Sequence, residues 1–178
     1  MYSIVDEVPF AGVELLRPIV GSGFRKILGT AFLVERELVC ALTFVLCDRL
    51  ESPQYVTLSS TRFETDHDAL DWARFEIRTA ESLEVALDGS GRFYHDVSQI
   101  VIHEDAVVRR IAIMAAHVSG SIEAVTYDAY IVFELSNGRS VSFGHAPRTF
   151  EGVCVSFGKP ETLANPTDVR QRIVISCP

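Results

Sequence analysis

The sequence predicts a mainly β or α+β protein, folded as an antiparallel β-barrel or β-sandwich with one or two short helices. Alternating and β-branched runs outnumber helical periods along the chain. These runs are short, and turn residues separate them. In the strongest local signal, two β-rich runs flank Ser136-Asn137-Gly138, where Asn-Gly supplies the positive φ angles of a type I′ hairpin turn.

The expected strands follow in chain order. The first, Val13–Val20, ends at the glycine-rich break Gly21-Ser22-Gly23. Ile27–Val34 and Leu38–Leu46 are expected to pair as a hairpin, because only three charged residues separate them. The other expected strands are Tyr55–Ser59, Arg74–Arg78, Leu83–Leu87, Val97–His103, Ala129–Leu135, Arg139–Phe143, Gly152–Phe157 and Arg170–Ser176. We expect the last of these to close a sheet.

Two segments leave the choice between helix and strand open. Ala106–Ser119 is long enough for a helix, but its many β-branched residues favour a strand. A helix is possible near Asp66–Ala80, although we interpret the polar, acidic stretch Thr65–Asp71 as a loop. Neither segment has clear helix caps.

Length and charge limit the possible functions. The 178 residues fit a single globular domain, 1–178, and no repeat or linker divides them. A chain of this length buries roughly 70% of its unfolded surface, so it needs no disulfide or metal to fold. The net charge of −8 argues against nucleic-acid binding, which requires cations, and it permits a basic protein partner.

The cysteines and the apolar stretches predict a cytoplasmic protein. None of the cysteines forms a C-x-x-C pair, and Cys40 and Cys154 lie in apolar runs, as buried thiols do. A bridge from Cys40 or Cys47 to Cys154 remains an open alternative. The N-terminus does not resemble a signal peptide, and the longest nearly uncharged apolar stretch, Leu38–Leu46, is too short to span a membrane.

No complete catalytic, metal-binding or cofactor-binding motif is present. The sequence has no G-x-S-x-G nucleophile turn, and its glycines lack the spacing of a phosphate-binding loop. The histidines lack zinc-site spacing. We therefore expect no metal and no cofactor.

Two parts of the sequence resemble trypsin-like serine proteases. Gly29–Val34 followed by Leu38–Val45 resembles the strand and turn of that family's first barrel, G-x-G/A-F-L-V followed by T-A-A-H-V. Ile100–His103 and Ile111–Ile113 resemble the strand that leads to its catalytic aspartate.

The catalytic residues of that family are missing here. Phe44 stands at the place of the histidine and Arg110 at the place of the aspartate. No G-D-S-G-G sequence follows, and too few residues remain after Gly120 for a typical second barrel. The resemblance thus implies at most an inactive relative, and we attribute it to residues that are common in strands.

An acidic segment is the candidate partner-binding site. Residues 64–88 hold eight acidic residues against Arg74 and Arg78. Acidic side chains attract a basic partner, and an exposed tryptophan makes a good interface anchor. The predicted partner-binding residues are Glu64, Asp66, Asp68, Asp71, Trp72 and Glu76. Alternatives are a solvated acidic loop, a cation site without the EF-hand glycine and closing glutamate, and a tryptophan packed in the core.

The predicted function is that of a non-enzymatic binding protein that neutralises a basic protein partner, such as a bacterial immunity or antitoxin-type protein. One alternative is an enzyme whose site is assembled from scattered residues around His103, with Asp105 and His117. Another is a structural subunit that assembles through a sheet edge. The sequence does not predict the oligomeric state.

Overall fold

The computed structural model describes residues 1–34, 37–47, 55–80, 98–101, 106–145, 152–158 and 168–177. The described residues are mainly antiparallel β with one short α-helix, which confirms the predicted class. The described strands form one connected sheet of 11 strands, and one isolated antiparallel bridge, between Gly23 and Val107, joins the residues before Phe24 to those before Val108. The predicted barrel or sandwich is not confirmed.

The described strands range in length from 4 to 13 residues. The helices are α1 (Phe10–Leu16) and the 3-10 helix η1 (Arg17–Ile19). The strands are β1 (Tyr2–Asp6), β2 (Phe24–Val34), β3 (Glu37–Cys47), β4 (Tyr55–Glu64), β5 (Asp71–Ala80), β6 (Ser98–Val101), β7 (Val108–Ser119), β8 (Glu123–Leu135), β9 (Ser140–His145), β10 (Val153–Phe157) and β11 (Val169–Ser176).

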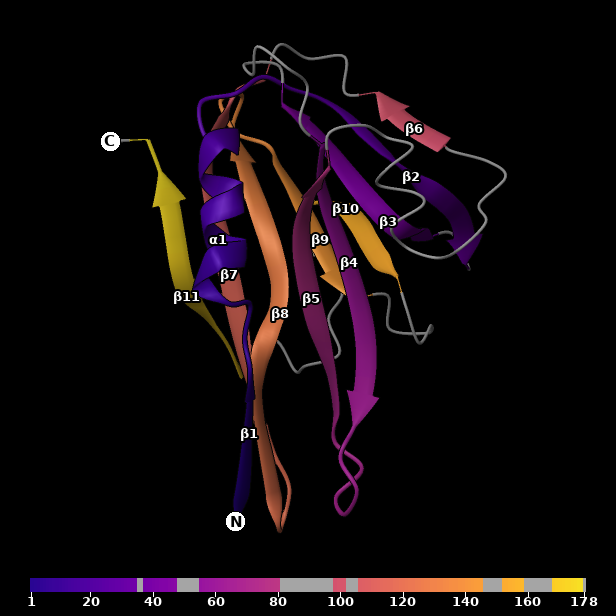
Figure 1. The fold of residues 1–178 in the computed structure, drawn as a ribbon, viewed down its shortest axis with the longest axis vertical. Coiled ribbons are helices and arrows are strands. Elements are labelled where there is room, and N and C mark those ends of the chain that lie inside the picture. Colours follow the sequence, from indigo (N-terminus) through magenta and orange to yellow (C-terminus); the bar gives the residue numbers. More distant parts are fainter. Residues whose placement is uncertain are drawn as a thin grey trace.

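The sheet follows the order β11-β7-β8-β9-β10-β3-β2-β6 and branches at β3. Val39 and Cys40 of β3 pair with β10, whereas Thr43–Leu46 pair with β4, which continues into β5. β1 is the one parallel addition among the described pairs, and it lies beside the first half of β8. The branch places the β4–β5 hairpin and α1 over the same side of the β7–β10 layer (Figure 1).

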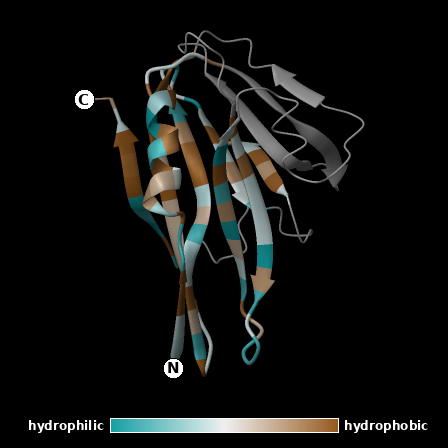
Figure 2. Cartoon of the chain, viewed as in Figure 1, coloured by the Kyte–Doolittle hydropathy of each residue, from teal (hydrophilic) through white to brown (hydrophobic). Residues whose placement is uncertain are grey.

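The core lies between these two layers. α1 contributes Val13 and Leu16, β5 contributes Phe75 and Ile77, and the facing strands contribute further branched and aromatic side chains. Apolar and polar residues alternate along β4 and β5, as a two-sided strand requires (Figure 2). Phe133 lies at the centre of an aromatic group, with ring centroids 5.7 Å from Phe24 and 5.1 Å from Phe143.

A second group of buried residues, which includes Trp72, Ala116 and Val125, contains one buried hydroxyl that has no hydrogen-bond partner within the described structure. Tyr127 is 1% exposed, and its Oη atom is unpaired. Burial raises the pKa of Tyr127, and the nearby Asp71 charge adds to this effect. An unsatisfied buried hydroxyl costs free energy, so Tyr127→Phe is expected to raise the free energy of unfolding by about 1 kcal/mol in urea denaturation. A loss of stability instead would show that the hydroxyl is hydrogen-bonded in solution.

Two secondary-structure predictions are wrong. Val13–Val20 is not a strand, because α1 begins after Pro9 and buries Gly12, Val13 and Leu16 along one side. A Cβ at Gly12 would lie 3.0 Å from Val8 Cγ1, so a small residue lets the helix pack closely. The suggested helix near Asp66–Ala80 is also absent, since the strand β5 occupies this segment from Asp71 onward.

The predicted Asn-Gly hairpin is confirmed, although its turn differs in type. Of the residues in the turn, only Gly138 has a positive φ, at 82°. Its N–H donates to the carbonyl of Leu135 at 3.1 Å, and the N–H of Leu135 donates to the carbonyl of Arg139 at 2.8 Å. This is a three-residue connection with glycine in the left-handed position, whereas a type I′ turn needs two such residues.

The other strand predictions that fall on described residues are confirmed, including the β2–β3 hairpin and a strand for Ala106–Ser119. Arg170–Ser176 is a strand, but it lies at one end of the sheet and does not close it. Leu83–Leu87 lies outside the described residues. Cys154 is buried, as predicted, and Cys177 is exposed. In the part of the chain that is described, no helix is long and apolar enough to cross a membrane.

Candidate functional site

Three segments far apart in the sequence meet at the narrow lower end of the molecule (Figure 1). They are the start of β1, the loop between β4 and β5, and the turn between β7 and β8. We call residues 1–2, 64–70 and 120–123 the tip. The tip contains three of the six predicted partner-binding residues, Glu64, Asp66 and Asp68.

Two carboxylates join the two hairpin ends of the tip to each other. The carboxylate of Asp68 accepts hydrogen bonds from Ser121 Oγ and the Ile122 N–H, both at 2.7 Å, and from the Glu123 N–H at 2.6 Å. In return, the carboxylate of Glu123 accepts from the N–H groups of His67 at 3.0 Å and Asp68 at 2.9 Å. We call this reciprocal arrangement the clasp. Charged acceptors make such bonds stronger than those between neutral groups.

The clasp holds both carboxylates in the ionised form. The Ser121 hydroxyl, followed by the backbone N–H groups of Glu123 and Ile122, lowers the pKa of Asp68 to about 2. The backbone N–H of Asp68 is the largest cause that lowers the pKa of Glu123, followed by the Thr65 hydroxyl. Because both values lie below those of the unfolded chain, the clasp stabilises the fold above about pH 4 and loses this contribution as the pH falls toward 2.

The backbone of the tip is also internally bonded. The Thr65 N–H donates to the Leu70 carbonyl and the Leu70 N–H donates to Thr65 Oγ1, each at 3.0 Å. The Tyr2 N–H donates to the Ile122 carbonyl at 2.8 Å. Ala69 has a φ of 51°, a left-handed conformation that an alanine adopts only when its surroundings enforce it. The three segments are therefore fixed relative to one another before any partner binds.

Gly120 allows the close approach on which the clasp depends. A Cβ at this position would lie 2.5 Å from Cγ of Asp68 and 2.7 Å from its Cβ, closer than such atoms approach. Gly120→Ala is therefore expected to displace Asp68, while the strands remain folded. Hydrogen exchange of the Ile122 and Glu123 amides should accelerate by at least about tenfold, since both lose their acceptor. Gly138→Ala is not a matched control, because the backbone of Gly138 has a positive φ that strains an alanine. The exchange rates of core amides in β7, measured in the same protein, serve as the reference instead.

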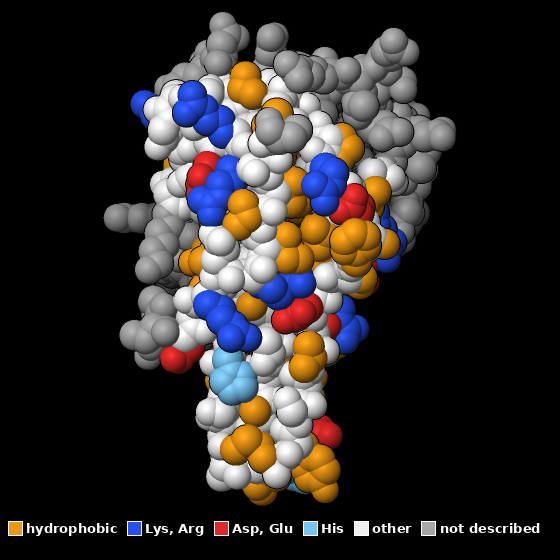
Figure 3. Space-filling view, turned by 90° about the vertical axis from the view of Figure 1, so that its left-hand side faces the viewer, with side chains coloured by type: hydrophobic (Ala, Val, Ile, Leu, Met, Phe, Trp, Pro, Cys, Tyr) orange, Lys and Arg blue, Asp and Glu red, His pale blue; other side chains and the backbone are white. Residues whose placement is uncertain are grey.

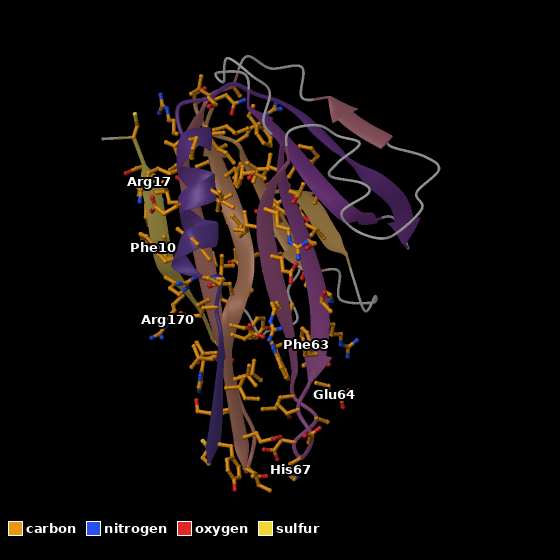
Figure 4. The ribbon with its side chains drawn as sticks, viewed as in Figure 1. Phe10, Arg17, Phe63, Glu64, His67 and Arg170 are labelled. Atoms are coloured by element: carbon orange, nitrogen blue, oxygen red, sulfur yellow. The ribbon has the colours of Figure 1, made fainter. Side chains whose placement is uncertain are left out.

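The clasped segments present apolar side chains beside carboxylates. Met1 is 81% exposed, Tyr2 72% and Ile122 46%. Hydrophobic side chains are visible at the narrow lower end in Figure 3. Glu64 is also exposed, and Figure 4 shows it near His67 at the same end.

Glu64 and Asp66 differ from the other acidic residues of the described structure. Among the carboxylates whose side chains are described, these two take part in no hydrogen bond or ion pair. The remaining ones are engaged within the molecule: Asp6, Glu7, Glu14, Asp68, Asp71, Glu76, Glu123, Asp128, Glu134 and Asp168. Among the described side chains, the carboxylates without any partner are thus both at the tip.

The other three predicted partner-binding residues are engaged in contacts within the protein. Asp71 receives two hydrogen bonds from Arg62, at 2.8 and 2.7 Å. Glu76 pairs with Arg78 at 2.6 Å on the surface of β5. Trp72 is 7% exposed, and its Nε1–H donates to Asp6 at 2.9 Å. Its place is inside the protein beside the tip, so it can support a docking surface without forming part of it.

Sequence reasoning missed most of the apolar residues at the tip. Met1 and Tyr2 were overlooked because the strand β1 was not predicted. Ser121, Ile122 and Glu123 are more than 50 residues from Asp68, so no local pattern links them. The isolated Ile122 in the polar run Ser119–Glu123 was the only available signal, and it is a weak one.

Of the three residues named for an enzymatic site, His117 is the one that the structure describes, and His103 and Asp105 lie outside the described residues. His117 is exposed on β7, with Nδ1 2.9 Å from Thr126 Oγ1. Ser60 Oγ lies 2.9 Å from His145 Nδ1, but both residues are only 2% exposed. The described residues contain no group of three or more potential metal ligands.

No family model, curated protein or solved structure matches this chain. The resemblance to trypsin-like proteases gains no support from these comparisons. Arg110, at the place of that family's aspartate, forms an ion pair with Glu134 at 2.7 Å. The argument for function therefore rests on the tip.

Proposed function

We propose that this protein is a non-enzymatic binding protein whose tip docks onto a basic protein partner and neutralises it, as bacterial immunity and antitoxin-type proteins do. The observation that carries the proposal is the clasp, which fixes exposed apolar side chains at the same end of the molecule as two carboxylates that have no partner among the described residues. A tip with only a structural role would not require exposed Tyr2 and Ile122 side chains. An interface needs both an apolar centre and a charged rim.

The rigidity of the tip favours tight binding. Ordering a loop during association costs free energy, and the clasp removes this cost because the loop is already held. Tyr2 is the side chain best suited as an anchor, since exposed tyrosines frequently dominate binding energy. Glu64 and Asp66 are placed to attract cations and to accelerate association.

A basic enzyme that acts on an anionic substrate is the partner class that fits this surface. Carboxylates at a narrow end can occupy a cationic cleft by mimicking the charge of the substrate. We propose the cytoplasm as the compartment, because a free thiol at the exposed Cys177 suits a reducing environment.

A pull-down from the native cells at low and high salt tests the proposal. We expect a basic protein to be retained at low salt and largely lost at high salt, since screening weakens exposed charge pairs. Recovery of only this protein itself at both salt concentrations would contradict the proposed partner and favour a structural subunit.

A further inference from the structure

A second surface, separate from the tip, lies where α1 meets the outer strand of the sheet. β11 pairs with β7 on one side, and no described strand pairs with its other edge. A β-bulge interrupts its register between Gln171 and Ile173. From Ile173 to Ser176 the register is regular, so this half of the strand has the geometry needed to accept another strand.

Exposed apolar side chains accompany this regular half of β11. Val174 is 41% exposed, and Phe10 of α1 is 76% exposed, which is unusual for a large aromatic residue. Figure 4 shows Phe10 on the outer side of the molecule, between Arg17 and Arg170. Figure 3 faces this side and shows hydrophobic side chains among arginines.

The charge of β11 is opposite to that of the whole protein. The strand contains two arginines and no acidic residue in a chain with a net charge of −8. Arg172 is already engaged, because Asp128 and Glu7 surround it. Arg170 is exposed and takes part in no ion pair within the described residues. A carboxylate supplied by a partner would complement it.

We infer that this surface binds an extended, acidic segment of another protein, which adds a strand to the outer edge of β11. The backbone of the segment pairs with Ile173–Ser176, one apolar side chain packs against Val174 on one face of the sheet, the next faces Phe10 on the α1 side, and a carboxylate reaches Arg170 beyond the bulge. Because the bulge adds a residue between Arg170 and Val174, their partners on β7 are Ala115 and Ala112, so the carboxylate and the apolar anchor are about 10 Å apart along the segment and on opposite faces of it. This inference does not depend on the proposed function of the tip.

The probes are two short synthetic peptides of alternating valine and threonine, one with glutamate at its N-terminal end and one with glutamate at its C-terminal end. Each is added to the full protein. We expect one of the two to shift the amide resonances of residues 173–176. Arg170→Glu should weaken this binding by about threefold and Phe10→Ser by about tenfold.

Two matched variants control for charge and for apolar surface. Arg109 is also exposed and without an ion pair among the described residues, so Arg109→Glu makes the same change of charge elsewhere. Phe157 is 64% exposed on β10, so Phe157→Ser matches the loss of the aromatic ring. Neither should alter peptide binding.

Three results would overturn the inference. The first is no shift with either peptide, and the second is equal binding of a peptide with lysine in place of glutamate. The third is dimerisation of the free protein in sedimentation velocity that Phe10→Ser abolishes, because the occupant of the edge would then be a second copy.

Discussion

Arg172→Met is expected to lower the free energy of unfolding by about 3–5 kcal/mol, because it leaves a buried charge without its partner. Asp128 is 1% exposed, and its carboxylate accepts hydrogen bonds from Arg172 at 2.8 and 2.5 Å. The same carboxylate accepts from the Val8 N–H at 2.7 Å, so the pair also fixes the segment between β1 and α1. Urea denaturation monitored by circular dichroism measures the loss.

Arg110→Met is the matched control for this substitution. Arg110 pairs with Glu134 at 2.7 Å, but both side chains are more than a third exposed. Solvent screens such a pair, so its loss is expected to cost less than about 1 kcal/mol. Equal losses for the two variants would show that the Asp128–Arg172 pair has no special role.

Phe133→Ala is expected to destabilise the protein by a similar amount, about 3–5 kcal/mol, because it removes a ring from the middle of the core. Phe133 is fully buried between Phe24 and Phe143. Phe143 is on the other strand of the β8–β9 hairpin and Phe24 is on the distant strand β2, so the substitution leaves a cavity between residues of three strands. The midpoint of urea denaturation should fall accordingly.

Phe10→Ala makes the same chemical change at an exposed position. Phe10 is 76% exposed, so the expected effect on the free energy of unfolding is within about 0.5 kcal/mol. A large loss at Phe10 would contradict its position on the surface, and would also weaken the case for the binding surface beside β11.

The fold class was predictable from the sequence because strands and tight turns have local sequence patterns. Alternation marked β5, and the Asn-Gly turn marked the β8–β9 hairpin. The helix α1 was missed because its β-branched and leucine residues suit a strand equally well, and tertiary packing against β5 decided the outcome. The branch at β3 depends on pairings between distant residues, which no local pattern encodes.

The candidate site was predictable only in part. The concentration of acidic residues indicated the loop end of the β4–β5 hairpin as the candidate site, but charge alone could not separate bonded from unbonded carboxylates. Asp68 and Asp71 have partners in the fold, whereas Glu64 and Asp66 have none among the described residues. That distinction depends on Arg62 and on the β7–β8 turn, and so it required the structure.

The most direct test of the central claim compares the affinity of two charge-reversed variants for the partner recovered at low salt. Glu64→Lys with Asp66→Lys changes the tip, and Glu14→Lys with Glu134→Lys makes the same change of net charge at exposed positions elsewhere. We predict that the tip variant loses at least about tenfold in affinity, while the control loses less than about threefold. Equal losses would attribute the binding to net charge alone, and unchanged affinity of the tip variant would contradict the tip as the binding site.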